Sequence, residues 1–236
     1  MKIGIMQPYF FPYIGYLSLI KNTDKFILLD EVQFRYHGWI ERNRILKPSE
    51  GWQYIKVPLE KHSQKTLIKD IKIKEGEEWR ELIVRQLEHY KKQAPYYDKV
   101  ISLIKKSIYI ETDSITVLNK NILKNICEYL NIKSEIIIFS EMNLSIDVPT
   151  CADEWALNIC KAMGNVNEYW NPEGGITFFN KDKYINENID IKFLKIYLNN
   201  YNQRRNNFEE GLSIIDVMMF NSTKEIIEMM DNYTFI

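Results

Sequence analysis

Residues 1–20, MKIGIMQPYFFPYIGYLSLI, decide the fold that we expect for this 236-residue chain. The apolar run at residues 3–6 predicts a strand, and Gln7-Pro8 ends it. An aromatic loop stiffened by Pro12 follows, and apolar residues at helical spacing predict a helix over residues 15–22. In open α/β sheets, ligands bind at the carboxyl end of such a strand, because loop amides and a helix N-terminus converge there. The stretch therefore predicts a ligand-binding mouth.

A second strand is expected at residues 25–30, KFILLD, because a near-continuous apolar run indicates burial on both faces. The order strand, helix, strand predicts a βαβ unit with parallel strands and a right-handed crossover. Asp30 then falls at the carboxyl end of the second strand, beside the end of the first. A carboxylate at that position can face a ligand.

The rest of the chain is expected to alternate between strands and helices. A change to helical periodicity after Gly76 predicts a helical lobe at about residues 76–132, with helices over 77–92, 97–107 and 115–130. The other predicted strands cover 52–59, 67–73, 135–139, 191–197 and a short stretch from 168 into a Gly174-Gly175 turn. The other predicted helices cover 152–163, which Gly164 would end as a C-cap, and 212–220.

Composition limits the function classes. With 31 basic and 32 acidic side chains, the net charge of −1 gives no reason to expect nucleic acid or an anionic membrane as partner. No segment has the pattern of a signal peptide or a membrane-spanning helix, so we expect a cytoplasmic protein without membrane insertion. Cys127, Cys151 and Cys160 lack CxxC spacing and are expected as buried thiols; we predict neither a metal site nor a bound redox cofactor.

Residues 31–45 mix polar, aromatic and cationic side chains without a strand or helix period. Arg42 and Arg44 are spaced to grip separate phosphate oxygens or a carboxylate, and Trp39 offers a stacking face. The alternative is an exposed basic turn in which Arg42 pairs with Glu41 or Glu31. His37 belongs to the same stretch, although a lone histidine is more often structural than catalytic.

Asp216 lies inside the apolar stretch LSIIDVMMF, residues 212–220. A buried carboxyl is costly unless it is paired or used, and burial would raise its pKa toward that of a general base. The alternatives are a helix cap or a buried ion pair with Arg204 or Arg205. Lys56 is expected to point away from the face that carries Ile55.

The motifs QPYFFPYIGYLSLI, KFILLDEVQF and WIERNRI, with YWNPEGG and LSIIDVMMF near the end, resemble the WbqC-like family of bacterial proteins. The resemblance covers nearly the whole chain. It implies a role in the biosynthesis of O-antigen, the polysaccharide of lipopolysaccharide, or of another bacterial surface polysaccharide.

A second resemblance concerns the first two strands. Their order and the intervening P-x-x-x-P-x-x-G-x are similar to the start of pantothenate synthetase and other nucleotidylyltransferase-like enzymes, whose H-x-G-H loop holds ATP phosphates. Tyr13-Ile-Gly-Tyr16 occupies that place here, with both histidines replaced. Because tyrosine is neutral near pH 7, the cations would have to come from Arg42, Arg44 or Lys56.

Together these features predict an α/β fold with a parallel-sheet, nucleotidylyltransferase-like core and a helical subdomain inserted in the middle of the chain. The predicted activity is amide formation between a small carboxylic or amino acid and a nucleotide-linked amino sugar, with ATP and Mg²⁺ in the acyl-adenylate version. The alternatives are a glycosyltransferase or ATP-independent acyltransferase of the same pathway, and a non-catalytic nucleotide-binding protein. The candidate catalytic residues are Asp30, His37 and Asp216, and the candidate binding residues are Gln7, Tyr9, Tyr13, Gly15, Tyr16, Gln33, Trp39, Arg42, Asn43, Arg44, Lys56, Gly174 and Gly175.

Overall fold

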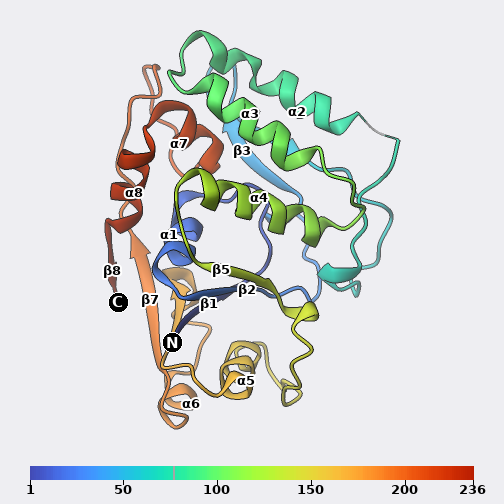
Figure 1. Cartoon of the computed structure of the whole chain (residues 1–236), viewed down its shortest axis with the longest axis vertical. Helices are drawn as coiled ribbons and strands as arrows, with labels where there is room; N and C mark the ends of the chain where they lie inside the picture. The colour runs from blue at the N-terminus through green and yellow to red at the C-terminus, as the bar shows by residue number, and fades with distance from the viewer. Residues whose placement is uncertain (77) are drawn as a thin grey trace.

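A central six-stranded sheet organises the computed structural model, which describes residues 1–76 and 78–236 (Figure 1). The strand order is β5-β2-β1-β6-β7-β8, parallel except for the last pair. A separate antiparallel hairpin pairs β3 with β4. The strands are β1 (Lys2–Met6), β2 (Lys25–Leu28), β3 (Arg42–Leu46), β4 (Trp52–Lys56), β5 (Glu135–Ile138), β6 (Glu168–Pro172), β7 (Asp190–Ile196) and β8 (Tyr233–Phe235).

Helices cover both faces of the sheet, with α5 and α6 on one side and α1 and α4 on the other (Figure 1). The helices are α1 (Ile14–Asn22), α2 (Trp79–Leu87), α3 (Tyr97–Ile108), α4 (Ile115–Tyr129), α5 (Glu154–Met163), α6 (Lys181–Ile185), α7 (Ile214–Phe220) and α8 (Thr223–Asp231). Within the described part of the chain, no helix combines the length and the apolar character needed to cross a membrane.

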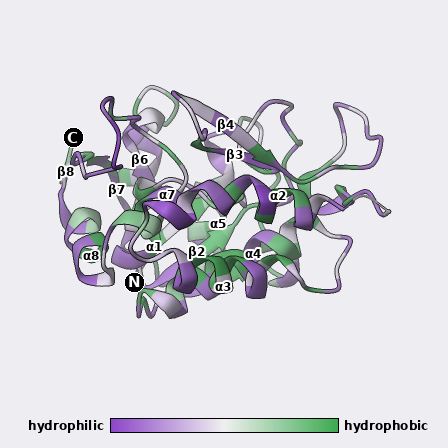
Figure 2. Cartoon of the chain, turned by 90° about the horizontal axis from the view of Figure 1, so that it is seen from above, coloured by the Kyte–Doolittle hydropathy of each residue, from purple (hydrophilic) through white to green (hydrophobic). Residues whose placement is uncertain are grey.

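Burial of both faces explains the apolar runs of the first strands. Ile3, Ile5 and Ile27 pack in a core with α5 and α6, whereas Phe26 and Leu28 pack in a larger core on the opposite face. Hydrophobic residues accordingly cluster on the central strands and on the helix faces turned toward them (Figure 2). The predicted βαβ unit is confirmed, because β1 and β2 pair in parallel on either side of α1.

Several predicted boundaries hold. The strands at 52–56, 135–138, 168–172 and 190–196, and the helices α3, α4, α5 and α7, occupy the expected stretches. Gly164 ends α5 in the left-handed conformation at φ 74°, as a C-cap glycine does. Lys56 is exposed while Ile55 and Val57 are buried, which confirms the predicted alternation.

The strand predicted at 67–73 is wrong. Ile68 and Ile71, three residues apart, are both buried, and the chain forms a short 3-10 turn at Ile68–Asp70. The predicted first residue of the helix expected over 77–92 lies outside the described residues. Among the described residues, α2 begins at Trp79 and is followed by a 3-10 helix at Glu88–Lys92.

Strand β3 was not expected, because its buried positions include a polar residue. Asn43 and Ile45 face inward, and Arg42 and Arg44 are half-buried. Burial therefore alternates along the strand, but the buried positions are not all apolar. The sequence pattern also did not predict α6, α8 or β8.

The loop from Gln7 to Tyr13 turns its carbonyl groups into the protein, where donors from distant segments bind them. Asn43 Nδ2 donates to the carbonyls of Phe10 (3.1 Å) and Phe11 (2.9 Å). Phe11 has a positive φ of 39°. The other donors are Tyr16 Oη to Gln7 O (2.9 Å), Asn119 Nδ2 to Pro8 O (2.8 Å), Ser213 Oγ to Phe11 O (2.7 Å) and Ile214 N to Pro12 O (2.8 Å).

We predict that Asn43→Ala lowers the free energy of unfolding by about 2 to 4 kcal/mol, because it leaves a buried carbonyl without its donor and opens a small cavity. Chemical denaturation followed by circular dichroism measures this. Asn206, which is exposed and forms no hydrogen bond among the described residues, supplies the control Asn206→Ala. Equal stability of the two variants would contradict the assigned role of Asn43.

Candidate functional site

The sheet has a topological switch point between β1 and β6. From β1 the chain moves to β2 on one side, whereas β6 pairs with β1 on the other. Loops leaving the carboxyl ends of two such strands diverge and leave a crevice, the usual ligand position in open α/β sheets. Asn171 Nδ2 lies 3.9 Å from Met6 Sδ at this point, and the charge of Glu173 acts on Tyr13. We call this region the β1/β6 mouth: Gln7, Tyr9, Tyr13, Asn171 and residues 173–175.

Tyr13 is the tyrosine of the predicted Tyr13-Ile-Gly-Tyr16 loop that lies at the mouth. Its ring folds over Gly15, where a β-carbon would come within 2.4 Å of Tyr13 Cε2. Burial of the ring raises the pKa of Tyr13 to about 12, so its hydroxyl is a proton donor at neutral pH. Tyr16 is fully buried and donates its hydroxyl to Gln7 O. Gly15 therefore keeps space for Tyr13, and Tyr16 supports the loop from within.

The two glycines after β6 differ. A β-carbon on Gly175 would come within 2.2 Å of Asn171 Oδ1, whereas one on Gly174 would meet no atom within 4 Å. Gly175 is thus required by close packing with Asn171. Gly174 is exposed at the mouth and leaves its backbone open to an approaching group.

Asp30 is buried two residues beyond β2 and binds the loop after β5. Its Oδ1 accepts from Ser140 N (3.0 Å) and its Oδ2 from Ser140 Oγ (2.6 Å). Burial raises the pKa of the Asp30 carboxyl despite these hydrogen bonds. The carboxyl ends of β2 and β5 are joined by this contact.

Tyr9 packs on Tyr16, and their ring centroids are 5.3 Å apart. Tyr9 is also close enough to Arg35 for the charge of the arginine to act on its hydroxyl.

The β3–β4 hairpin carries the predicted cations. Arg42 lies opposite Lys56 across the hairpin, and its guanidinium stacks on Tyr54 at 4.3 Å from the ring centroid. It donates to the carbonyls of His37 (2.8 Å) and Gly38 (3.3 Å). His37 itself is exposed and has a positive φ of 64°.

Arg44 lies between two indole rings. Its guanidinium is 5.6 Å from the Trp39 centroid and 5.2 Å from the Trp52 centroid, and Nη2 donates to Gly211 O at 2.9 Å. Its Nε is buried and has no hydrogen-bond partner in the described part of the chain. The guanidinium therefore reaches the segment before α7.

Neither of the two alternative ion pairs of Arg42, with Glu41 or with Glu31, is present. Glu31 pairs with Lys69 at 2.6 Å, and Glu41 is buried, with the pKa of its carboxyl raised by that burial. Among the described residues, no ion pair involves Arg42, Arg44 or Lys56. Arg42 and Lys56 lie directly opposite each other on the hairpin, and the charges of both act on the Glu41 carboxyl, lowering its pKa against the effect of burial. Gln33, the remaining candidate binding residue of this region, is exposed and forms an isolated antiparallel β-bridge with Leu67.

Asp216 is fully buried and is held by three neutral donors. Its oxygens accept from Tyr90 Oη (2.7 Å), Gln203 Nε2 (3.0 Å) and Tyr201 Oη. Burial, opposed by these hydrogen bonds, raises the pKa of Asp216 to about 6.

Neither alternative role of Asp216 is observed. Arg205 donates to the carbonyls of Lys47 and Gly51, and the N-cap of α7 is Ser213. Asp216 instead lies in a hydrogen-bonded cluster with the aromatic hydroxyls.

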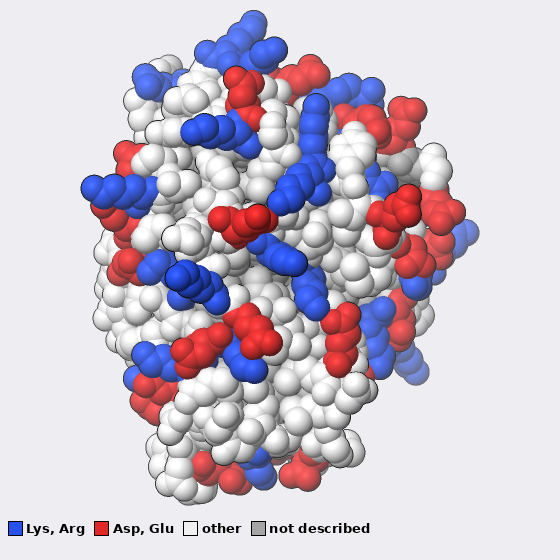
Figure 3. All heavy atoms as spheres, viewed as in Figure 1, with Lys and Arg blue, Asp and Glu red and all other residues white. Residues whose placement is uncertain are grey.

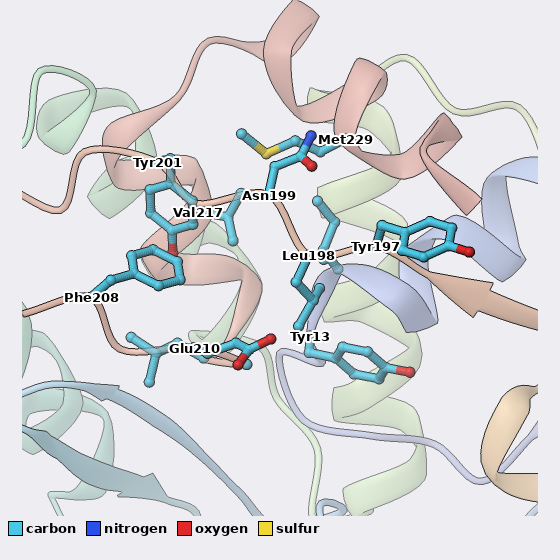
Figure 4. Close-up of a pocket in the computed structure, with 12 residues that line it drawn as sticks. Tyr13, Tyr197, Leu198, Asn199, Tyr201, Phe208, Glu210, Val217 and Met229 are labelled. Atoms are coloured by element: carbon cyan, nitrogen blue, oxygen red, sulfur yellow. The ribbon is translucent and has the colours of Figure 1, made fainter. Parts of the chain in front are cut away.

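A cavity opens at the carboxyl end of β7, beside the mouth (Figure 4). The space inside it that a water-sized sphere can occupy is about 30 Å³. Tyr13 lines the cavity as well as the mouth, so the two regions share a wall. The remaining lining residues are Ile14, Tyr197, Leu198, Asn199, Tyr201, Phe208, Glu210, Gly211, Leu212, Val217 and Met229.

Sequence reasoning missed Tyr90, Tyr201, Gln203 and Glu210. The unusually polar segment 199–207 was a signal for part of this set. Of the cysteines, Cys127 and Cys160 are buried as predicted, but Cys151 is exposed. Among the described residues, no three His, Cys, Asp or Glu side chains are placed to hold a metal ion. Acidic and basic side chains are interspersed on the face seen in Figure 3.

Comparison with known proteins gives two matches. The sequence pattern of the WbqC-like protein family matches residues 7–228. The uncharacterized protein Rv1507c of Mycobacterium tuberculosis strain H37Rv is 28% identical over 226 residues, which cover 92% of each chain. No solved structure matches the chain.

We predict that Asp216 makes stability fall as pH rises. Its folded pKa of about 6 exceeds the ordinary 3.8, so its contribution is fully present below pH 3.8 and is lost through about pH 6. The loss amounts to about 3 kcal/mol at 1.36 kcal/mol per pKa unit. Asp216→Asn should remove this part of the pH dependence in unfolding experiments, whereas the exposed Asp182→Asn should keep it. The same pH dependence in both variants would show that Asp216 does not titrate as described.

Proposed function

The chain belongs to the WbqC-like protein family, and on that premise we propose that it forms an amide bond in bacterial surface-polysaccharide (O-antigen) biosynthesis. The acyl donor is a small carboxylic or amino acid, and the acceptor is the amino group of a nucleotide-linked sugar. The observation that carries this proposal is the β1/β6 mouth at the topological switch point of the sheet. The hairpin whose Asn43 holds the loop of the mouth also carries Arg42, Arg44 and Lys56, which form no ion pair among the described residues.

In the ATP-dependent reaction, a carboxylate oxygen of the acid attacks the α-phosphorus of ATP and pyrophosphate leaves. The sugar amine then attacks the acyl carbon of the acyl-adenylate, AMP leaves, and the nitrogen loses a proton. Mg²⁺ would enter with the triphosphate. Holding the two reactants together supplies much of the rate enhancement in such transfers.

Each part of the site has a role in this proposal. Lys56, Arg42 and Arg44 bind phosphate oxygens, as charged groups do at sites of phosphoryl and acyl transfer. The Tyr13 hydroxyl donates a hydrogen bond at the mouth, in the place of the first histidine of a nucleotidylyltransferase-like loop. Asp30 holds the loop of Ser140 at the carboxyl ends of β2 and β5.

The reaction itself is the first test. Purified protein incubated with ATP, Mg²⁺, glycine and a dTDP-linked amino sugar should release AMP and consume the amine, as followed by chromatography and mass spectrometry. Amide formed only from a preactivated acyl donor would replace the ATP-dependent version with an ATP-independent acyltransferase. Neither AMP nor amide from a broad panel of acids and amino sugars would refute the proposal.

We predict that Lys56→Gln weakens nucleotide binding about 5- to 50-fold, because it removes one charge-assisted contact to phosphate. Lys56 is exposed and forms no ion pair among the described residues, so the melting temperature without ligand should change little. Thermal shift with ATP and with dTDP measures both quantities. Lys224→Gln, on exposed α8, is the matched control; an equal nucleotide response of the two variants would remove Lys56 from the site.

A further inference from the structure

The loop from Gln7 to Tyr13 sorts its aromatic rings by polarity. Phe10 and Phe11 are fully buried, whereas Tyr9 and Tyr13 are half-buried at the β1/β6 mouth. The rings that carry no polar atom thus pack into the core. The rings that carry a hydroxyl lie where a second molecule can contact them, with an apolar body and a polar tip.

Three polar side chains at the mouth have no hydrogen-bond partner within the described part of the chain. They are the hydroxyls of Tyr9 and Tyr13 and the side-chain amide of Gln7. Tyr16 shows the contrast, because its hydroxyl donates to Gln7 O at 2.9 Å. A half-buried polar group without a partner loses part of its hydration and gains no hydrogen bond from the protein in return. Each of the three can still form its hydrogen bonds with a ligand.

The two tyrosine hydroxyls influence each other and stay neutral. The ionisation of Tyr9 acts on that of Tyr13, and burial raises the pKa of both hydroxyls, that of Tyr13 to about 12. The charged groups that act on them have opposite signs, since Arg35 acts on Tyr9 and Glu173 acts on Tyr13. In Figure 4 the hydroxyl end of Tyr13 points away from the cavity beyond β7. The mouth thus offers neutral hydrogen-bonding groups rather than one kind of charge.

The loop that carries these groups is fixed from behind. Its carbonyls accept hydrogen bonds from Asn43 in β3, Asn119 in α4 and Ser213 at the start of α7. Because the backbone is held in this way, the side chains at the mouth lie in place before a ligand binds. Binding then costs little ordering of the protein, which favours affinity.

Neutral hydroxyl and amide groups beside aromatic rings suit a sugar ring. Sugar hydroxyls donate and accept hydrogen bonds, as do the hydroxyl of tyrosine and the amide of glutamine. The C–H groups of the sugar ring can pack against tyrosine rings, whose bodies are apolar. A phosphate or an ammonium group would instead be recognised by groups of the opposite charge.

We propose that the β1/β6 mouth binds the sugar ring of the nucleotide-linked acceptor, whose hydroxyl groups form hydrogen bonds with Tyr9, Tyr13 and Gln7. This inference rests on the proposed function, which it deepens by assigning the sugar to the mouth and the phosphates to the cations of the hairpin. Gly174 leaves space for the ring on the side of β6, because a β-carbon there would meet no atom within 4 Å.

The proposal can be tested by binding of a free sugar, without turnover. Methyl glucoside has a neutral hydroxylated ring, and 2-methoxytetrahydropyran has the same ring without hydroxyl groups. Saturation-transfer NMR at millimolar ligand should detect methyl glucoside on the protein and give a much weaker signal with the second compound. Inorganic phosphate should not displace methyl glucoside, because phosphate is recognised by cations.

Tyr9→Phe and Tyr13→Phe remove the hydroxyls and keep the rings. Each should weaken methyl glucoside binding about 3- to 10-fold, the effect of losing one hydrogen bond between neutral groups. Their melting temperatures without ligand should change little, since neither hydroxyl has a partner in the described part of the chain.

Tyr129→Phe is the matched control. Tyr129 is also half-buried and has no hydrogen-bond partner among the described residues, but it ends α4, ahead of the amino end of β5. This variant should bind methyl glucoside as the unmodified protein does. No signal with methyl glucoside, an equal signal with the ring that lacks hydroxyls, displacement by phosphate, or unchanged binding in Tyr9→Phe and Tyr13→Phe would each overturn the proposal.

Failure of the two proposals can be told apart. If methyl glucoside binds as predicted but no amide forms from any acid and amino sugar, the sugar site stands and the amide-forming activity fails. If amide forms and Tyr9→Phe and Tyr13→Phe leave the KM for the amino sugar unchanged, the activity stands and the assignment of the mouth to the sugar is overturned.

Discussion

The structure depends on satisfying the carbonyl groups of one loop. Residues 7–13 leave β1 with their carbonyls turned inward, and a buried carbonyl without a donor costs about 1 to 3 kcal/mol. Tyr16, Asn43, Asn119 and Ser213 supply side-chain donors from four different elements. Because those elements are far apart in sequence, the loop takes its shape only when α1, β3, α4 and α7 are all in place.

This constraint explains why the candidate site lies where it does. Asn43 faces the loop, so Arg42 and Arg44 must occupy the other face of β3, where aromatic rings receive them. Ser213 faces the loop from the start of α7, which brings the preceding residues 208–212 to the cavity. Tyr13, at the end of the loop, is then left between the mouth and the cavity.

Three carboxyl groups show how environment separates chemically similar side chains. Asp30 is buried and occupied by Ser140, and Asp216 is buried and occupied by two tyrosines and a glutamine. Burial raises the pKa of both. Glu210 is exposed and without a partner among the described residues. The first two therefore fix loops and rings, whereas the third is exposed to solvent.

The sequence by itself determined the parts whose information is local. The spacing of the apolar residues predicted β1, α1 and β2. The apolar runs of the strands indicated burial on both faces and therefore a parallel sheet, and Gly164 marked the end of α5. Only the tertiary structure decided the partners of polar side chains. Strand β3 could not be recognised from the sequence, because its inward-facing Asn43 is polar and is buried through hydrogen bonds to a loop 32 residues away. In the same way, Asp216 accepts a hydrogen bond from Tyr90, which is 126 residues away in the sequence. Local periodicity records which side of an element is buried, but the path of the whole chain determines what lies opposite it.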